Sequence, residues 1–479
     1  MKIRNKIPVA LGRLLVLALF PAAAMTQEVQ YVDTAKIMRH EFSVQQAIDY
    51  AKKNNVNVKN ALLDVQYQEQ VNREVTSRAY PGINASLGSA YNPNIATQVI
   101  PNFISPATYQ VLIDEGVKDG NGNTIQMPAD FGFIAAQFGT KYSATAGISL
   151  SQILFDGQVF VGLQARDATI RFAKKNAEVT EEMIRTNIYK IYYQLVVGNT
   201  QVELLDANIE RLEKLLKDTR IIYENGFAEK LDIDKLTVQL TNLQTEKRKV
   251  LNTISNGYYG LKVLIGMPVQ DELVLTDKLS DDQIKDHILE GSVYSYEDRK
   301  DFQYAQVGKE LNEFNIRRYK LSQIPTISLN GQYAKNAQRN KWNFLGKGDW
   351  FTISSVNLNI AIPIFNGFYT KSKIQQTKIQ LQQTENRIEA LKLSIDSEVE
   401  SAKNNFRSAI SNMDFQKKNM ELAEKVYQQT KKKYEVGTGS QTEINAAQVE
   451  LKTAQTSYIT ALYDAVIARI DFLKATGKL

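Results

Sequence analysis

The 479-residue chain contains no cysteine, and its only histidines are His40 and His287. Without cysteine there are no disulfide bonds, thiolate metal sites, cysteine nucleophiles or acylated N-terminal cysteines. Two isolated histidines also exclude a histidine-rich metal site. No group of side chains combines a nucleophile, a base and an acid. The sequence therefore predicts a protein that is not an enzyme and that holds no cofactor and no metal.

Proline and net charge are also scarce. Only 10 prolines and 25 glycines interrupt the chain, so long regular helices and strands are possible. The formal charge is +6, but four of the basic residues and none of the acidic ones lie within residues 1–24, so without this segment the charge falls to +2. A weak and dispersed charge argues against nucleic acid as a partner.

The first 24 residues have the layout of a secretory signal peptide. A basic start is followed by the apolar run Leu14–Phe20 and by the small residues Ala22–Ala24. The apolar run is much shorter than the roughly 20 residues of a membrane-spanning helix, which makes a signal anchor the weaker interpretation. We expect export, with cleavage after Ala24.

The remainder of the chain repeats itself at an offset of 210 to 211 residues. Tyr223–Gly226 recurs as Tyr434–Gly437, and Leu154–Gly157 recurs as Ile364–Gly367. Each half predicts a helix, a strand, a long loop, a strand, a very long helix, a tight turn and a long helix. This pattern divides the chain into a signal peptide (1–24), a first repeat (25–266), a linker (267–294) and a second repeat (295–479).

Four segments alternate between apolar and small or polar residues, as strands with two different faces do. The clearest are Tyr142–Ser151 and Val356–Ile364, with partner strands near residues 83–91 and 327–333. The edge of a soluble β-sandwich would alternate similarly. The lengths of two of these strands, near 14 residues, and the aromatic residues at the loop ends favour membrane strands. We expect lipid contact for Ile148, Leu150, Leu358 and Ile360, and a lumenal position for Ser149 and Asn359.

The predicted long helices carry a heptad pattern. Ten of twelve positions spaced by four and three residues from Ile184 to Tyr223 are apolar, and the register returns from Val399 to Tyr434. An alanine-rich seam follows from Ile444 to Phe472. Such sustained seams predict coiled coils. Residues 158–223 contain no proline, so this helix can extend for roughly 100 Å. The strand-to-helix positions of Asp156 and Asn366 predict N-caps.

Geometry then constrains the assembly. Four strands are too few for a membrane barrel, which needs about eight, and lipid does not tolerate open sheet edges. Several chains must share one barrel, as a dimer of 8 or a trimer of 12 strands. The two loops, near residues 92–140 and 335–351, lie at the strand ends away from the helices. We expect the loops outside the cell and the helices in the periplasm.

After the signal peptide, nearly the whole chain resembles the TolC-type outer-membrane efflux proteins. The resemblance lies in the strand-to-helix junctions, in the two helical-tip turns, and in an acid nine residues after each turn tyrosine. The junction residues are Phe155, Asp156, Gly157, Phe365, Asn366 and Gly367; the turn residues are Tyr223, Gly226, Tyr434 and Gly437; the acids are Asp232 and Glu443. The sequence departs from the family pattern at Ala446, where a further acid is common, and in its unusually long first loop.

The resemblance implies an α+β membrane protein. In this family a homotrimer shares a 12-stranded transmembrane β-barrel, which a long periplasmic barrel of coiled coils continues. It also implies an outer-membrane location, contact with outer-membrane lipid, and a passive role in a tripartite efflux pump or a type I secretion system. The partners would be a periplasmic adaptor (membrane fusion protein), which contacts the helical tips, and an inner-membrane pump. Our alternative is a periplasmic coiled-coil adaptor or scaffold without a membrane segment, which should have a single hairpin.

Several motifs have two interpretations. Ser440–Glu443 is a capping box, but in a trimer Glu443, with Asp232 as a second candidate, could also form a ring of carboxylates at the periplasmic aperture. Gly226 and Gly437 predict left-handed C-caps, which is compatible with adaptor contact at the tips. Residues 119–123 resemble a calcium loop only faintly, and we interpret them as a hairpin tip.

Overall fold

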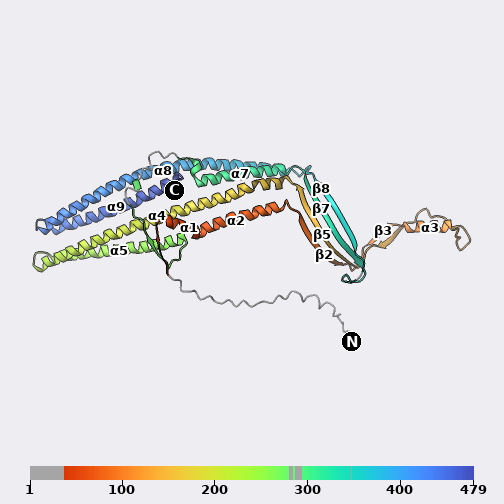
Figure 1. Cartoon of the computed structure of the whole chain (residues 1–479), viewed down its shortest axis with the longest axis horizontal. Coiled ribbons are helices and arrows are strands. Elements are labelled where there is room, and N and C mark those ends of the chain that lie inside the picture. The colour runs from red at the N-terminus through yellow and green to blue at the C-terminus, as the bar shows by residue number, and fades with distance from the viewer. Residues whose placement is uncertain (1–36, 280–283, 286–293, 347) are drawn as a thin grey trace, which may run out of the picture.

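The computed structural model describes residues 37–279, 284–285, 294–346 and 348–479. The predicted signal peptide and part of the predicted linker lie outside the described residues. The molecule is strongly elongated, with long helical hairpins at one end, a four-stranded sheet next to them and a small extension beyond the sheet (Figure 1). Within the described residues, no helix is both long enough and apolar enough to cross a membrane.

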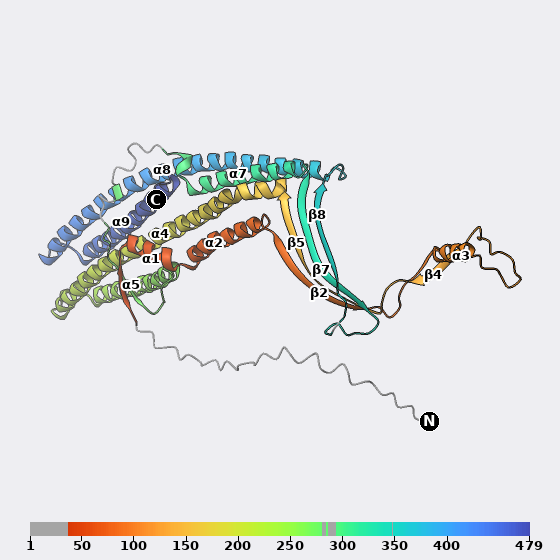
Figure 2. The same ribbon diagram turned by 45° about the vertical axis from the view of Figure 1, so that its right-hand side comes forward.

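The helices follow the predicted order in both halves. The first half contains α1 (Val44–Asn54), α2 (Val56–Ser77), α4 (Gly157–Glu224) and α5 (Lys230–Ile265). The second contains η1 (Tyr296–Asp298), α7 (Lys300–Leu321), α8 (Tyr369–Glu435) and α9 (Gln441–Ala475). The longest, α4 and α8, have 68 and 67 residues and each folds back through a tight turn onto a shorter helix. Figure 2 shows the two resulting hairpins pointing in the same direction.

Many of the predicted heptad positions lie in the core of these hairpins, and their side chains are buried. They include Ile188, Leu195 and Leu212 in α4, Phe406 and Met413 in α8, and Ile444, Leu451 and Phe472 in α9. Where α8 meets α9, the rings of Phe406 and Phe472 stack with their centroids 5.9 Å apart. The alanines of α9, such as Ala461 and Ala465, are also buried and permit close helix contact.

The main sheet is antiparallel, with the strand order β2-β5-β7-β8. Its strands are β2 (Gly82–Tyr91), β5 (Tyr142–Phe155), β7 (Thr326–Arg339) and β8 (Phe351–Ala361). Two predicted boundaries were wrong. β7 continues to Arg339 because its polar second half pairs with both neighbours, which shortens the second loop to residues 340–350. β8 ends at Ala361, before Pro363, because proline has no N–H for the ladder.

Strand register places the apolar side chains on one face of this sheet. Ile83 lies opposite Leu150, and Ile327 lies opposite Ile360. Ser149 and Asn359, paired with Gln332 and Ser328, lie on the other face. The apolar face is uncovered: Leu87 is 85% and Val356 77% exposed. The sheet is therefore a single layer with two faces of different chemistry.

Two smaller sheets were not predicted. β1 (Arg39–Phe42) pairs in parallel with β6 (Glu272–Leu275), which joins the first described residues to the region after α5. The first loop contains β3 (Thr97–Pro101), α3 (Ile104–Asp114) and β4 (Phe133–Gln137), with β3 and β4 antiparallel. The predicted hairpin tip is present, because Lys118 and Thr124 form a β-bridge around residues 119–123.

A buried polar network links the two hairpins. The side-chain amide of Asn208 in α4 donates to Gln455 Oε1 in α9 at 2.6 Å, and Gln448 Nε2 donates to Asn208 Oδ1 at 3.1 Å. All three side chains are buried. Because an unsatisfied buried amide is costly, both glutamines depend on Asn208.

We expect Asn208→Leu to reduce the free energy of unfolding by about 1–3 kcal/mol, because both glutamine amides lose a partner. Thermal unfolding of the detergent-solubilised protein, followed by circular dichroism, measures the change. Thr456→Ala is the matched control, because Thr456 is exposed and its hydroxyl donates to Lys452 O in its own helix. Equal stability of the two variants would contradict the role assigned to the network.

Candidate functional site

The turn between α4 and α5 is built by its glycine. Gly226 has φ 81°, and its N–H donates to Tyr223 O at 2.9 Å. The N–H of Phe227 donates to Ile222 O at 3.0 Å. This pair of bonds is the Schellman motif, with Tyr223 two positions before the C-cap and Gly226 directly after it.

The turn between α8 and α9 repeats this geometry. Gly437 has φ 78° and donates to Tyr434 O at 3.0 Å, while Thr438 donates to Lys433 O at 2.9 Å. A Cβ added at Gly226 or Gly437 would meet no atom within 4 Å. Both glycines are therefore needed for their left-handed backbone and not for space. The predicted C-caps are confirmed.

Both tips also carry exposed apolar side chains that the sequence analysis did not single out. Phe227 is 87% exposed and Val436 is 73% exposed, each adjacent to the turn glycine. Tyr223 is exposed as well, whereas Tyr434 is half-buried, with its OH 3.4 Å from Thr219 Oγ1. The position of an apolar residue directly beside a Schellman glycine was the sequence signal that could have identified them. These side chains therefore give the end of each hairpin an exposed apolar surface.

The two acids near the tips have different local structures. Glu443 forms the predicted capping box: its Oε2 accepts from the N–H of Ser440 at 3.2 Å, and Ser440 Oγ accepts from the N–H of Glu443 at 3.2 Å. Its side chain is exposed. Asp232 lies in the first turn of α5, half-buried, with Lys235 Nζ 4.0 Å away. The N-cap of α5, Glu229, makes no side-chain capping bond.

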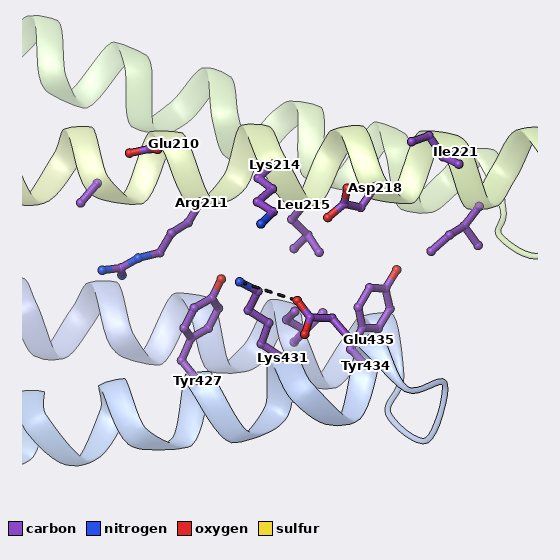
Figure 3. A pocket seen from close by; sticks show the side chains of 13 residues that line it. Glu210, Arg211, Lys214, Leu215, Asp218, Ile221, Tyr427, Lys431, Tyr434 and Glu435 are labelled. Atoms are coloured by element: carbon purple, nitrogen blue, oxygen red, sulfur yellow. Dashed lines mark ion pairs between the residues drawn. The ribbon is translucent and has the colours of Figure 1, made fainter.

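A groove of about 540 Å³ separates the two hairpins near their tips. Figure 3 shows Arg211, Lys214 and Asp218 of α4 facing Tyr427 and Lys431 of α8 across it. The guanidinium of Arg211 lies 5.8 Å from the Tyr427 ring centroid. Burial raises the pKa of the Tyr427 hydroxyl. The groove therefore combines charged and aromatic groups from both halves.

The first strand-to-helix junction agrees with prediction. Asp156 is the N-cap of α4, and its Oδ1 accepts from the N–H of Gln158 at 2.7 Å. Phe155 lies beside Phe160, with ring centroids 5.4 Å apart. Gly157 is buried, and a Cβ there would lie 2.7 Å from both the carbonyl oxygen and the Cβ of Leu321. This glycine is needed for space, because α4 begins against the end of α7.

The second junction differs, and the prediction that Asn366 caps α8 was wrong. The N-cap is Phe368, with φ 64° and no side-chain capping bond. Asn366 instead donates from its amide to Thr370 Oγ1 at 2.6 Å. Gly367 has φ 62° and open space around it. The rings of Phe365 and Phe368, 5.4 Å apart, accompany this delayed helix start.

The two junction glycines should therefore respond differently to substitution. Asparagine tolerates the left-handed region, so we expect Gly367→Asn to be nearly neutral and Gly367→Val to cost about 1–2 kcal/mol. At Gly157 both Ala and Asn should destabilise, because any Cβ meets the Leu321 backbone. Melting temperatures of the four variants test this. A wild-type melting temperature for Gly157→Ala would refute the steric explanation.

Comparisons with known proteins show which proteins this chain is similar to. Residues 295–478 match the family model described as outer membrane efflux protein. A curated protein, outer membrane protein TolC of Vibrio cholerae, is 20% identical over 235 residues, which cover 48% of this chain and 53% of that protein. The aligned part thus spans about half of the length of this relative.

Solved structures share the fold over nearly the whole chain. VceC from Vibrio cholerae matches with a TM-score of 0.66 and 13% identity, covering 91% of this chain and 96% of that one. The Campylobacter jejuni CmeC outer membrane channel matches with a TM-score of 0.68 and 15% identity, covering 91% and 85%. The open state of the Neisseria gonorrhoeae MtrE outer membrane channel matches with a TM-score of 0.65 and 14% identity, covering 91% and 88%.

Proposed function

We infer that this chain, whose residues 295–478 match the family model described as outer membrane efflux protein, belongs to that family and is the outer-membrane channel of a tripartite efflux pump or a type I secretion system. It acts as a passive trimeric conduit from the periplasm to the exterior and catalyses no reaction. Its location is the outer membrane, with the helical hairpins in the periplasm. Comparison with CmeC and MtrE, both named as outer membrane channels, supports this proposal.

One observation carries the proposal: the sheet is a single layer with an uncovered apolar face and two edge strands, β2 and β8, that have no outer partner among the described residues. Lipid tolerates such a sheet only if its edges are paired. Cyclic symmetry closes it, and three copies give 12 strands, a size within the range of known membrane barrels. The helices that continue these strands then extend the barrel into the periplasm.

The partners follow from the two ends of the molecule. Two further copies of the chain complete the barrel, and lipid contacts its apolar face. A periplasmic adaptor contacts the helical tips around Gly226 and Gly437, where Phe227 and Val436 are exposed, and links the channel to an inner-membrane pump. We propose that the chain consists of a signal peptide (1–24), a first repeat (25–266), a linker (267–294) and a second repeat (295–479). Each repeat supplies two strands and one long hairpin.

The two faces of β8 test this function. Leu358→Arg should strongly reduce the amount of assembled trimer, because an arginine facing mid-bilayer lipid costs roughly 2–4 kcal/mol. The matched variant Asn359→Arg lies on the opposite, lumenal face and should assemble normally. Heat-modifiability gels of isolated outer membranes measure the trimer.

Equal tolerance of both arginines would count against the barrel. A wild-type protein that fractionates as a soluble periplasmic monomer would favour the adaptor alternative instead.

A second prediction concerns the aperture. We propose that three Glu443 carboxylates surround the axis at the periplasmic end, with Asp232 as a weaker contributor, and that this ring gives the channel a cation preference. Glu443→Gln should shift the reversal potential under a salt gradient toward that of an unselective pore. The shift should be modest, because Ala446 supplies no further acid.

Glutamine at 443 can still accept from the N–H of Ser440, so the helix cap is kept while the charge is removed. Glu450→Gln, an exposed position further along α9, is the control for a change in overall charge. An unchanged reversal potential in planar bilayers would leave Glu443 with a capping role alone.

A further inference from the structure

Residues 92–140 form an arm that continues the β2–β5 hairpin beyond the main sheet. In both views it projects from the sheet end opposite to the helices (Figures 1 and 2). The stacked rings of Tyr91 and Tyr142, 4.8 Å apart, mark its base, where the pairing of β5 with β7 also ends. The arm therefore rises from the β2–β5 hairpin, at the edge of the sheet that β2 forms.

The arm has a defined internal structure. β3 and β4 form a two-stranded ribbon, and Asn102 joins this ribbon to α3 by accepting from the N–H of Ser105 at 3.0 Å and donating to Phe131 O at 3.3 Å. The rings of Tyr109 and Phe131 contact edge to face at 5.4 Å. At the far end, the N–H groups of Asn123 and Asn121 bond to the Asp119 carboxylate and lower its pKa.

Charge divides the arm into two parts. Residues 92–113 and 131–140, which we call the stem, contain no Asp, Glu, Lys or Arg. Residues 114–130, which we call the tip, contain every charged residue of the arm, four acidic and one basic. An uncharged stretch of this length is unusual on a surface that stays in water, whereas the tip has the composition of a solvated loop.

The stem is nevertheless uncovered within one chain. Phe133 is 72% and Val99 is 69% exposed, and α3 has no buried residue. Other exposed apolar side chains of the stem are Phe103, Ile104, Val111 and Phe138. A two-stranded ribbon is marginally stable alone in water, so this one needs a surface that covers it.

The charge pattern decides between the available surfaces. An anionic membrane surface attracts basic residues, yet the stem has none and the tip is net acidic. A second copy of the stem is, by contrast, uncharged and apolar. Position favours the same partner: in the trimer of the proposed function, β2 pairs with β8 of the next chain, so each arm rises at a junction between chains. Threefold symmetry then places three identical stems around one axis.

We propose that the three arms pack against one another through their uncharged stems and clamp the trimer together above its outer mouth, with the charged tips in water. This inference rests on the trimer of the proposed function. The long first loop would then hold the three chains together by binding the same loop in the other two copies.

The absence of cysteine from the chain allows a direct test. Val99→Cys and Phe133→Cys each supply one thiol per chain in the stem, and Asn121→Cys supplies one in the tip. We expect a short bifunctional maleimide, added to isolated outer membranes, to yield covalent dimers on denaturing gels for both stem variants and not for the tip variant. A membrane-impermeant maleimide should label the tip thiol readily and the stem thiols slowly.

Each other result overturns the clamp. Stem thiols that are labelled freely without crosslinking are exposed to water. Stem thiols that are shielded without crosslinking are covered by something other than this chain, such as lipid. Crosslinking at the tip equal to that in the stem would place the contact elsewhere. If the variants still form heat-modifiable trimers in these cases, the proposed function stands; a wild-type protein that never forms trimers contradicts the function itself.

A charge in the stem provides an independent measurement. Phe133→Asp should lower the temperature at which the trimer dissociates in detergent, because three carboxylates would be brought together in an apolar contact. Asn121→Asp adds the same charge at the tip and should leave that temperature unchanged. Dissociation of both variants at the wild-type temperature would contradict the proposal even if each folds normally.

Discussion

The pairing of backbone N–H and C=O groups along β2 and β8 is the constraint on which the rest of the architecture depends. Inside one chain these strands are the two edges of the main sheet. In the proposed function this sheet lies in lipid, which does not tolerate open edges, so there its edge strands pair with other chains. The same requirement links the number of strands to the symmetry of the proposed assembly. It also links the sheet to the direction of the helices, because β5 leads directly into α4 and α7 leads into β7.

The long helices of the two halves pack through seams of different side chains. In α4 the buried seam contains large residues such as Ile188 and Leu195, whereas α9 combines large residues such as Phe472 with small ones such as Ala461 and Ala465. Where α4 meets α9, the buried Asn208–Gln455 amide pair favours the alignment in which both side chains are bonded. Apolar burial stabilises the helices, and the polar pair selects their register.

Periodic signals made most of the fold predictable. Heptads in the long helices, alternation in the strands and the 211-residue repeat each rely on many residues, so errors at single positions matter little. The Schellman turns at Gly226 and Gly437 and the Ser440 capping box were also predictable, because a few neighbouring residues determine them. Contacts between distant segments gave no such signal: β1 pairs with β6 more than 200 residues away, and the polar end of β7 is a strand only because β5 and β8 flank it.

Asn366 shows why the strand-to-helix junctions were harder to predict from the sequence. Neighbouring strands lie about 4.8 Å apart, but packed helices need about 8–10 Å between their axes, so the chain must spread where strands become helices. At α4 and α7 this crowding is relieved by removing a side chain, because Gly157 lets the Leu321 backbone approach. At α8 it is relieved by delaying the helix through the left-handed residues Gly367 and Phe368. A repeated motif therefore kept its glycine in both halves for two different physical reasons.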